Sequence, residues 1–360
     1  MNKILISILF VAMLIGCTKQ KSYTLIGTAE SADLNGTLVR LDIFEGEEWV
    51  SLETIIENQT FTFEGVVEKP IMAYLLFRHP NPEKFIHPKT FILENTNIKF
   101  EITENLRVKV SGSRANDLIQ VFATEYDNLL PQEFVDSVQS ELLTEAEWHP
   151  RFTQYIEKRQ QLAYDFSKKH VNTLPGTAVF IDNRFLFSIE QRVTVFDLMN
   201  EATKNNSDIQ NLIESTEAQQ QVAAGQPFID FTLPTPTGEM LSLSDVVGNH
   251  DYVLLHFWAS WCGPCIGFFP ELTEFYREHA GKSFEIFSVS LDGDKENWEN
   301  AIEEFVLTWH HVSDLKIWDC EVRKLYGVNG ITHYTLIDRN GIIVGGRELS
   351  LDDIAELLQN

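Results

Sequence analysis

The sequence predicts an α/β domain at the C-terminal end of the chain, preceded by an antiparallel β-domain and a helical segment. Three patterns lead to this prediction. Between residues 23 and 112, apolar residues alternate with polar ones in short runs, as in half-buried strands. Between residues 113 and 222 they recur every three or four positions, as on helices. After residue 226, continuous apolar runs alternate with helical spacing, as in a sheet flanked by helices.

Residues 1–17 have the composition of a targeting segment. Lys3 precedes an apolar run from Ile4 to Ile15, which is shorter than the roughly 20 residues of a transmembrane helix. The run ends in Leu14-Ile15-Gly16-Cys17, which resembles the lipobox of bacterial lipoproteins. The resemblance implies cleavage before Cys17 and lipidation of that cysteine. An ordinary signal peptide is the alternative, and both readings predict a mature protein outside the cytoplasm.

The segment 23–112 is predicted to form an antiparallel sandwich or a small barrel. Alternating apolar residues mark its strands, for example Val39, Leu41 and Ile43, and later Ile98, Phe100 and Ile102. Turn signals such as Asn35-Gly36 separate these runs. The segment resembles a β-domain of unknown function that precedes the C-terminal domain in similar lipoproteins. His79 and His87, each followed by proline, are interpreted as loop residues rather than as metal ligands.

The segment 113–222 is predicted to be helical and to end in a linker. One helical face collects Leu118, Ile119, Phe122, Tyr126 and Leu129. Prolines punctuate the helices, and the polar stretch from Ser215 to Gly225 is interpreted as the linker. The aromatic residues of this segment are interpreted as core, with a peptide-binding groove as the alternative.

Residues 226–360 contain the most specific motif of the chain, Cys262-Gly263-Pro264-Cys265. It follows the apolar run from Tyr252 to Trp258 and precedes residues at helical spacing, so Cys262 is expected at a helix N-terminus. A free thiol titrates near pH 8.5, and such a position lowers the pKa to about 7 or below in C-x-x-C sites. Gly263 and Pro264 permit the tight turn that begins the helix.

The run Phe257-Trp258-Ala259, followed by Trp261-Cys262-Gly263-Pro264-Cys265, resembles the thioredoxin active-site signature. Pro270 and the later run Leu336-Ile337-Asp338 also fit this family, and residues 226–360 resemble membrane-attached thiol–disulfide reductases of the TlpA and ResA type. The resemblance implies a thioredoxin fold in which Cys262 and Cys265 form a redox disulfide. It also implies substrate contacts at Trp261, Gly263, Pro264, Ile331 and Thr332, and it implies no cofactor and no metal.

Three positions depart from the family pattern. Thr332 stands where the family has a cis-proline, and a cis bond before another residue costs about 2.5–4 kcal/mol. The Ile331–Thr332 bond is therefore expected to be trans, or cis under strain. Phe268 replaces a glutamate that is frequent in the reductases and thus removes an acid/base group. His256 replaces a buried aspartate, and it is either a proton acceptor for the cysteines or a core histidine.

The fourth cysteine, Cys320, is expected to be a bystander thiol rather than a resolving cysteine, because the family places its helix away from the active-site turn. A Cys3His zinc site that includes Cys320, and a purely structural disulfide, are weaker readings of the C-x-x-C pair. The chain has 360 residues and a formal net charge of −25, which argues against nucleic acid and anionic membrane surfaces as partners.

These observations predict a thiol–disulfide oxidoreductase of the cell envelope, most simply a reductase, that acts on protein disulfides. The resemblance places it on a lipid anchor facing the periplasm of a Gram-negative bacterium. A membrane-linked electron donor is expected because the bacterial periplasm is oxidising. A non-catalytic or metal-holding thioredoxin-like binding module is the alternative. A thiol peroxidase is disfavoured, because the residues before Cys262 lack the P-x-x-x-T-x-x-C pattern of peroxiredoxins.

Overall fold

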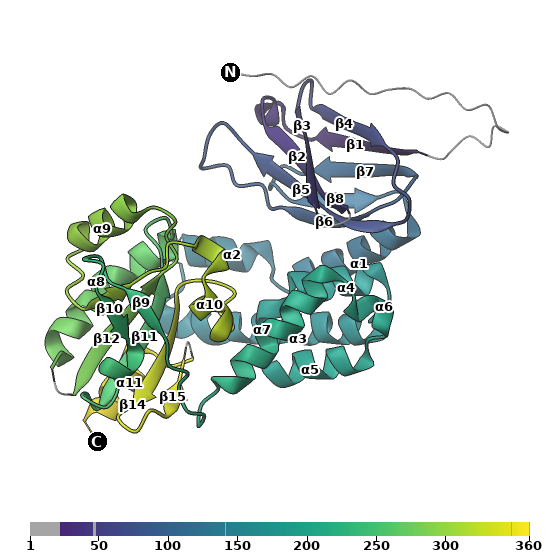
Figure 1. The fold of residues 1–360 in the computed structure, drawn as a ribbon. Helices are drawn as coiled ribbons and strands as arrows, with labels where there is room; N and C mark the ends of the chain where they lie inside the picture. The colour runs from purple at the N-terminus through teal and green to yellow at the C-terminus, as the bar shows by residue number, and fades with distance from the viewer. Residues whose placement is uncertain (1–21, 46–47, 141, 282, 347, 360) are drawn as a thin grey trace, which may run out of the picture. The chain divides into compact units, whose positions relative to one another are not determined.

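The computed structural model describes residues 22–45, 48–140, 142–281, 283–346 and 348–359 (Figure 1). The predicted targeting segment 1–17, including Cys17, lies outside the described residues. The chain divides into two units between Arg184 and Phe185. Within the described part of the chain, no helix combines the length and the apolar character that a membrane crossing requires.

The first unit contains two four-stranded sheets, in the orders β4-β1-β7-β8 and β3-β2-β5-β6 (Figure 1). The strands are β1 (Tyr23–Ala29), β2 (Leu38–Glu45), β3 (Glu48–Ile55), β4 (Thr60–Gly65), β5 (Ile71–Arg78), β6 (Lys89–Leu93), β7 (Asn97–Ile102) and β8 (Val108–Ser111). Their alternating apolar residues meet in one core, in which Leu41, Phe91 and Phe100 are buried. The predicted β-domain is confirmed, with one difference: β1 and β7 pair in parallel.

Four helices complete the first unit: α1 (Arg114–Asn128), α2 (Gln132–Gln139), α3 (Glu145–Lys169) and α4 (Leu174–Asp182). Ser113 caps α1 by accepting a hydrogen bond from the Asn116 N–H at 3.2 Å. The buried Asn116 amide also bonds the N–H and the carbonyl of Ile92, both at 2.8 Å. These bonds tie the first turn of α1 to strand β6.

The second unit is built on a five-stranded sheet in the order β13-β12-β11-β14-β15 (Figure 1). The strands are β11 (Tyr252–Trp258), β12 (Phe284–Ser290), β13 (His310–Val312), β14 (His333–Asp338) and β15 (Ile343–Gly345). The first three pair in parallel, and β14 and β15 join antiparallel. A separate hairpin pairs β9 (Thr232–Pro234) with β10 (Met240–Ser242). The helices that alternate with the strands of the five-stranded sheet or follow them are α8 (Gly263–His279), α9 (Lys295–Glu304), α10 (Glu321–Leu325) and α11 (Leu351–Leu358). This is the predicted thioredoxin fold.

The second unit also contains α5 (Ile189–Leu198), α6 (Glu201–Lys204) and α7 (Ser207–Gln221). The predicted linker at 215–225 is therefore wrong, because α7 continues to Gln221. The Gln219 amide donates to the Gly327 carbonyl at 2.6 Å and accepts from the Arg192 guanidinium at 2.5 Å. Gly327 has a φ of +62°, and a Cβ there would lie 2.5 Å from the Ser215 carbonyl oxygen. Helix α7 thus packs directly on the segment that follows α10.

Candidate functional site

The two cysteines of the motif lie on the turn between β11 and α8. Cys262 is the N-cap of α8, and its sulfur accepts a hydrogen bond from the Cys265 N–H at 3.2 Å. The two sulfurs are joined in a disulfide. When the disulfide opens, the unpaired N–H groups and the positive dipole end of the helix stabilise a thiolate on Cys262.

The two sulfur-bearing residues differ in their access to solvent. Cys262 is 5% exposed and Cys265 is fully buried. The residues around Cys262 are open, since Gly263 and Pro264 are exposed and Trp261 is 50% exposed. The Trp261 ring also lies 6.1 Å from the exposed ring of Trp318. An attacking or attacked sulfur from another molecule can therefore reach Cys262 but not Cys265.

A buried carboxylate holds the loop that leads to the cysteines. Asp292 follows β12 and is 1% exposed. Its oxygens accept from the Ser260 N–H at 3.0 and 3.2 Å, from the Ser260 hydroxyl at 2.6 Å and from the Ser290 hydroxyl at 2.6 Å. These bonds fix the position of Ser260 and, through the chain, of Cys262. We regard Asp292 as a positioning residue.

Residues 224–345 match the model of the AhpC/TSA family. The thiol-disulfide oxidoreductase ResA of Geobacillus thermodenitrificans is 34% identical over 143 residues, which are 39% of this chain and 78% of that protein. The chain belongs to the ResA-type thiol–disulfide oxidoreductases. A tryparedoxin of Trypanosoma brucei brucei is 35% identical over 116 residues, or 31% of this chain and 77% of that protein.

Among solved structures, the thioredoxin domain of a Bacteroides vulgatus thiol-disulfide oxidoreductase is 32% identical and has a TM-score of 0.35. The match covers 38% of this chain and 96% of that one. Residues 23–119 match a domain of unknown function, DUF4369. The two family matches and the similarity to ResA confirm the predicted resemblances of both regions. The chain is an enzyme of the oxidoreductase class.

In this oxidoreductase, the His256 imidazole is fully buried and bonds Ser288 rather than a cysteine. Burial, together with the nearby His333, lowers the pKa of His256 to about 3. The Ser288 hydroxyl accepts from the Trp309 indole N–H at 2.8 Å and lies 3.3 Å from Nδ1 of His256. A serine hydroxyl has one proton and two lone pairs, so Ser288 pairs with Nδ1 in either tautomer of the imidazole. Nε2 has no hydrogen-bond partner among the described residues.

This network favours the core-histidine reading of His256. Its Nδ1 is engaged by Ser288, and a base with a pKa of about 3 holds a thiol proton poorly. The role of His256 as a proton acceptor for Cys265 stays a prediction.

The oxidoreductase has a cis peptide bond between Ile331 and Thr332, so the trans alternative is wrong. The Thr332 hydroxyl oxygen is buried and has no hydrogen-bond partner in the described ranges. Phe268, the second departure from the family, stacks on Tyr334 with ring centroids 6.2 Å apart and planes 11° apart. An aromatic pair thus occupies the place of the family's glutamate. The substrate contacts expected at Ile331 and Thr332 stay predictions.

Cys320 is a free thiol, fully buried in the core of the second unit. Burial raises its pKa to about 11, and the carboxylate of Asp314 acts in the same direction. A protonated, enclosed thiol is a poor nucleophile. Within the described ranges, no group of three or more His, Cys, Asp or Glu side chains is placed to hold a metal ion.

Asp292 is the site residue that the sequence analysis missed. Replacing it with alanine would leave the half-buried donors of Ser260 and the buried hydroxyl of Ser290 without their acceptor. We expect Asp292→Ala to lower the free energy of unfolding by about 2–4 kcal/mol and to slow disulfide reduction, because the Ser260–Cys262 loop loses its anchor. Thermal unfolding and the second-order rate with a model disulfide measure both effects.

Asp294→Ala is the matched control. Asp294 caps α9 through the Asn297 N–H at 2.9 Å, so its loss should cost only about 1 kcal/mol and leave the rate unchanged. Equal rates for the Asp292→Ala variant and the wild-type protein would show that the loop needs no anchor.

Proposed function

We propose that the chain is a reductase of protein disulfides in the bacterial envelope and that it works through Cys262 and Cys265. The observation that carries this proposal is the asymmetry of the pair: Cys262 has the helix N-terminus and the open surroundings, and Cys265 is enclosed. The first property suits a nucleophile and the second suits a resolving thiol.

The reaction begins with both cysteines reduced. The Cys262 thiolate attacks one sulfur of a substrate disulfide and forms a mixed disulfide, and the other substrate sulfur leaves as a thiolate that takes up a proton. The Cys265 thiol loses its proton and attacks the sulfur of Cys262. The first substrate sulfur then leaves as a second thiol, and Cys262 and Cys265 remain as a disulfide. Two electrons have passed from the protein to the substrate.

The disulfide must be reduced again before another turnover. We assign this step to a membrane-linked dithiol donor, since the periplasm of a Gram-negative bacterium is oxidising. No residue of the chain is proposed to hold a cofactor.

The direction of the reaction is tested by the reduction potential of the Cys262–Cys265 pair. C-x-x-C proteins span about −270 to −120 mV, from reductants to oxidants. Equilibration with glutathione buffers and mass spectrometry should place this pair in the lower half of that range. A value near the upper end would identify an oxidant. Peroxide consumption would instead support the peroxidase alternative, and metal retention without turnover would support the binding module.

We further propose that the protein is anchored through a lipid on Cys17. The support is the Leu14-Ile15-Gly16-Cys17 sequence after a short apolar run. Wild-type protein should remain with membranes after a high-salt wash, whereas Cys17→Ala should carry no lipid by mass spectrometry. A soluble wild-type chain whose mature N-terminus lies elsewhere would refute the anchor.

A further inference from the structure

A cavity of about 1060 Å³ opens in the first unit and shares no residue with the cysteine site. Its walls come from the chain around Lys89 at the start of β6, from the turn between β7 and β8, from α1 and from Arg159 of α3. Ligand cavities in proteins commonly measure about 300–1,000 Å³. The cavity is thus large enough to hold an organic molecule with several functional groups.

The walls of this cavity are basic although the chain is strongly acidic. Four cations line it, namely Lys89, Arg107, Lys109 and Arg159, and Asp127 is the one carboxylate in the lining. The whole chain carries a formal net charge of −25. A local excess of positive charge on such a background favours an anion inside the cavity.

The partners of these cations leave much of their charge uncompensated. Arg107 forms an ion pair with Asp127, and Lys109 pairs with Glu101 at 3.2 Å. Arg159 donates from Nε to the Tyr126 carbonyl at 3.1 Å, and its guanidinium carbon lies 4.6 Å from the centre of the Tyr126 ring. These contacts fix the plane of the guanidinium, and Asp127, which already pairs with Arg107, is the carboxylate whose charge acts on it.

Lys89 is the least compensated of the four cations. No ion pair or hydrogen bond joins its ammonium group to another residue in the described part of the first unit. Burial lowers the pKa of Lys89, and the more distant charges of Asp182 and Asp127 only partly oppose this effect. Burying part of an ammonium group without a close partner costs free energy, and an anion bound in the cavity would offset this cost.

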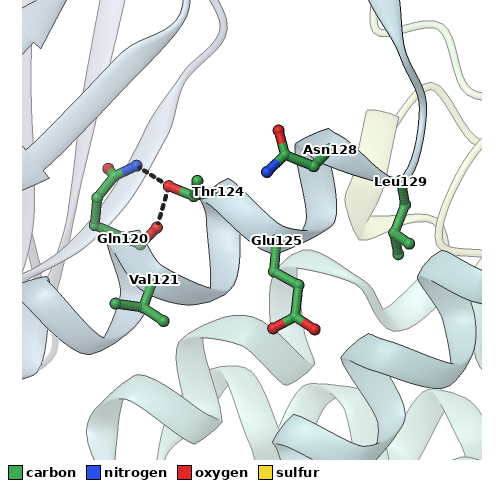
Figure 2. Close-up of a pocket in the computed structure, with 6 residues that line it drawn as sticks. All are labelled: Gln120, Val121, Thr124, Glu125, Asn128 and Leu129. Carbon is green, nitrogen blue, oxygen red and sulfur yellow. Dashed lines mark hydrogen bonds between the residues drawn. The ribbon is translucent and has the colours of Figure 1, made fainter.

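Helix α1 supplies the neutral part of the wall. Gln120, Thr124 and Asn128 are four residues apart and form one stripe along the helix, and Val121 and Glu125 form the neighbouring stripe (Figure 2). All five line a smaller pocket on α1, and the first three also line the cavity. Gln120 is held in place, since its oxygen accepts from the Val110 N–H at 2.8 Å. The Gln120 amide also donates to the Thr124 hydroxyl at 3.3 Å, so these two side chains form a fixed polar strip on the wall of the cavity.

We propose that this cavity binds an organic anion that carries carboxylates and is no larger than about a tripeptide. Arg107 and Arg159 present planar forks that match a carboxylate, and Lys89 supplies a point charge. Val108, Leu130 and the Tyr126 ring give the body of the ligand an apolar surface. This site is independent of the cysteine chemistry.

The test uses the full-length protein and two probes of equal size, N-acetyl-triglutamate and N-acetyl-triglutamine, in isothermal titration calorimetry. Triglutamate should bind at least roughly tenfold more tightly, because its carboxylates form charge-assisted hydrogen bonds that the amides of triglutamine cannot form. Its affinity should fall as salt is added. Equal affinities for the two probes, or no binding of triglutamate at millimolar concentrations, would overturn the proposal.

Substitutions of the cavity residues test whether triglutamate binds in the cavity. Lys89→Met and Arg159→Gln should each weaken triglutamate binding at least roughly fivefold, with the fold checked by circular dichroism. Arg159→Lys keeps the charge and removes the fork, so it covers the case in which Arg159→Gln does not fold. Lys99→Gln removes an exposed charge of β7 that does not line the cavity, and it should bind like the wild-type protein. If Lys99→Gln lowered the affinity for triglutamate as much as Lys89→Met does, the binding would be nonspecific charge attraction, and the proposal would be refuted.

Discussion

Cys262→Ser should reduce the rate of disulfide reduction to that of the assay without protein, whereas Cys265→Ser should accumulate a mixed disulfide with its substrate. Cys262 has the helix N-terminus and the access to solvent, so its loss removes the first attack. Cys265 is enclosed and acts only on the sulfur of Cys262. Without it, the covalent intermediate has no internal route to resolution.

The measurement is a turnover assay with a model protein disulfide, followed by nonreducing gel electrophoresis and intact-protein mass spectrometry. Cys320→Ser is the matched control, because it removes the one other described cysteine, a buried thiol. It should reduce substrate at the wild-type rate. Adducts on Cys262→Ser and none on Cys265→Ser would reverse the roles assigned to the two cysteines.

Acid should strongly destabilise the second unit, which contains Cys262 and Cys265. Burial lowers the pKa values of His256 and His311 to about 3, and each also feels the charge of a neighbouring histidine. In the unfolded chain both titrate near pH 6.5, so below that pH the unfolded state binds protons that the folded state does not. The penalty is absent above pH 6.5 and grows until about pH 3. Between pH 7.5 and pH 5, each histidine should lower the free energy of unfolding by about 2 kcal/mol. The two histidines together should lower the melting temperature by about 10 °C.

Tryptophan fluorescence follows this transition, since five of the seven tryptophans lie in the second unit: Trp258, Trp261, Trp298, Trp309 and Trp318. His256→Gln and His311→Gln should each remove about half of the acid loss. His250→Gln is the matched control at a half-buried position of the same unit, and it should leave the acid loss unchanged. A melting temperature equal at pH 5 and pH 7.5 in the wild-type protein would contradict the prediction.

Asp182 of the first unit should respond to acid in the opposite direction. Burial raises the pKa of Asp182 to about 6, and the bond from the Thr90 hydroxyl at 2.8 Å opposes this effect. The folded state therefore binds a proton below pH 6 that the unfolded state takes up only near pH 4. Protonation of Asp182 therefore stabilises the first unit as the pH falls from about 6 to about 4.

The cysteine turn could be predicted from the sequence because its determinants are adjacent. An apolar strand, two cysteines around Gly263-Pro264 and a helical face lie within one short stretch. The strands of the β-domain could be predicted for the same reason, because the alternation of apolar and polar residues lies within each short strand. Periodicity also predicted a sheet flanked by helices after residue 226, but it did not predict strand β13 or the parallel pairing of β1 and β7.

The remaining features depend on contacts between residues far apart in the chain. Asp292 acts through Ser260, which lies 32 residues earlier, and no spacing rule connects the two. The environment of His256 depends on Ser288 and Trp309, which lie on another strand and a later loop. The cations of the cavity are spread from Lys89 to Arg159, and only the fold brings them together.

Gln219 and Gly327 have a consequence for how this protein is divided. The family match begins at residue 224, after the end of α7. Yet the Gln219 side chain of α7 donates to the carbonyl of Gly327, which lies 108 residues later and inside the matched range. A fragment cut at residue 224 would expose that carbonyl and the surface around Gly327. Amide hydrogens of α7 should therefore exchange at the same rate as those of α10, as parts of one cooperative element. The boundary of shared ancestry and the boundary of cooperative folding fall at different residues of this chain.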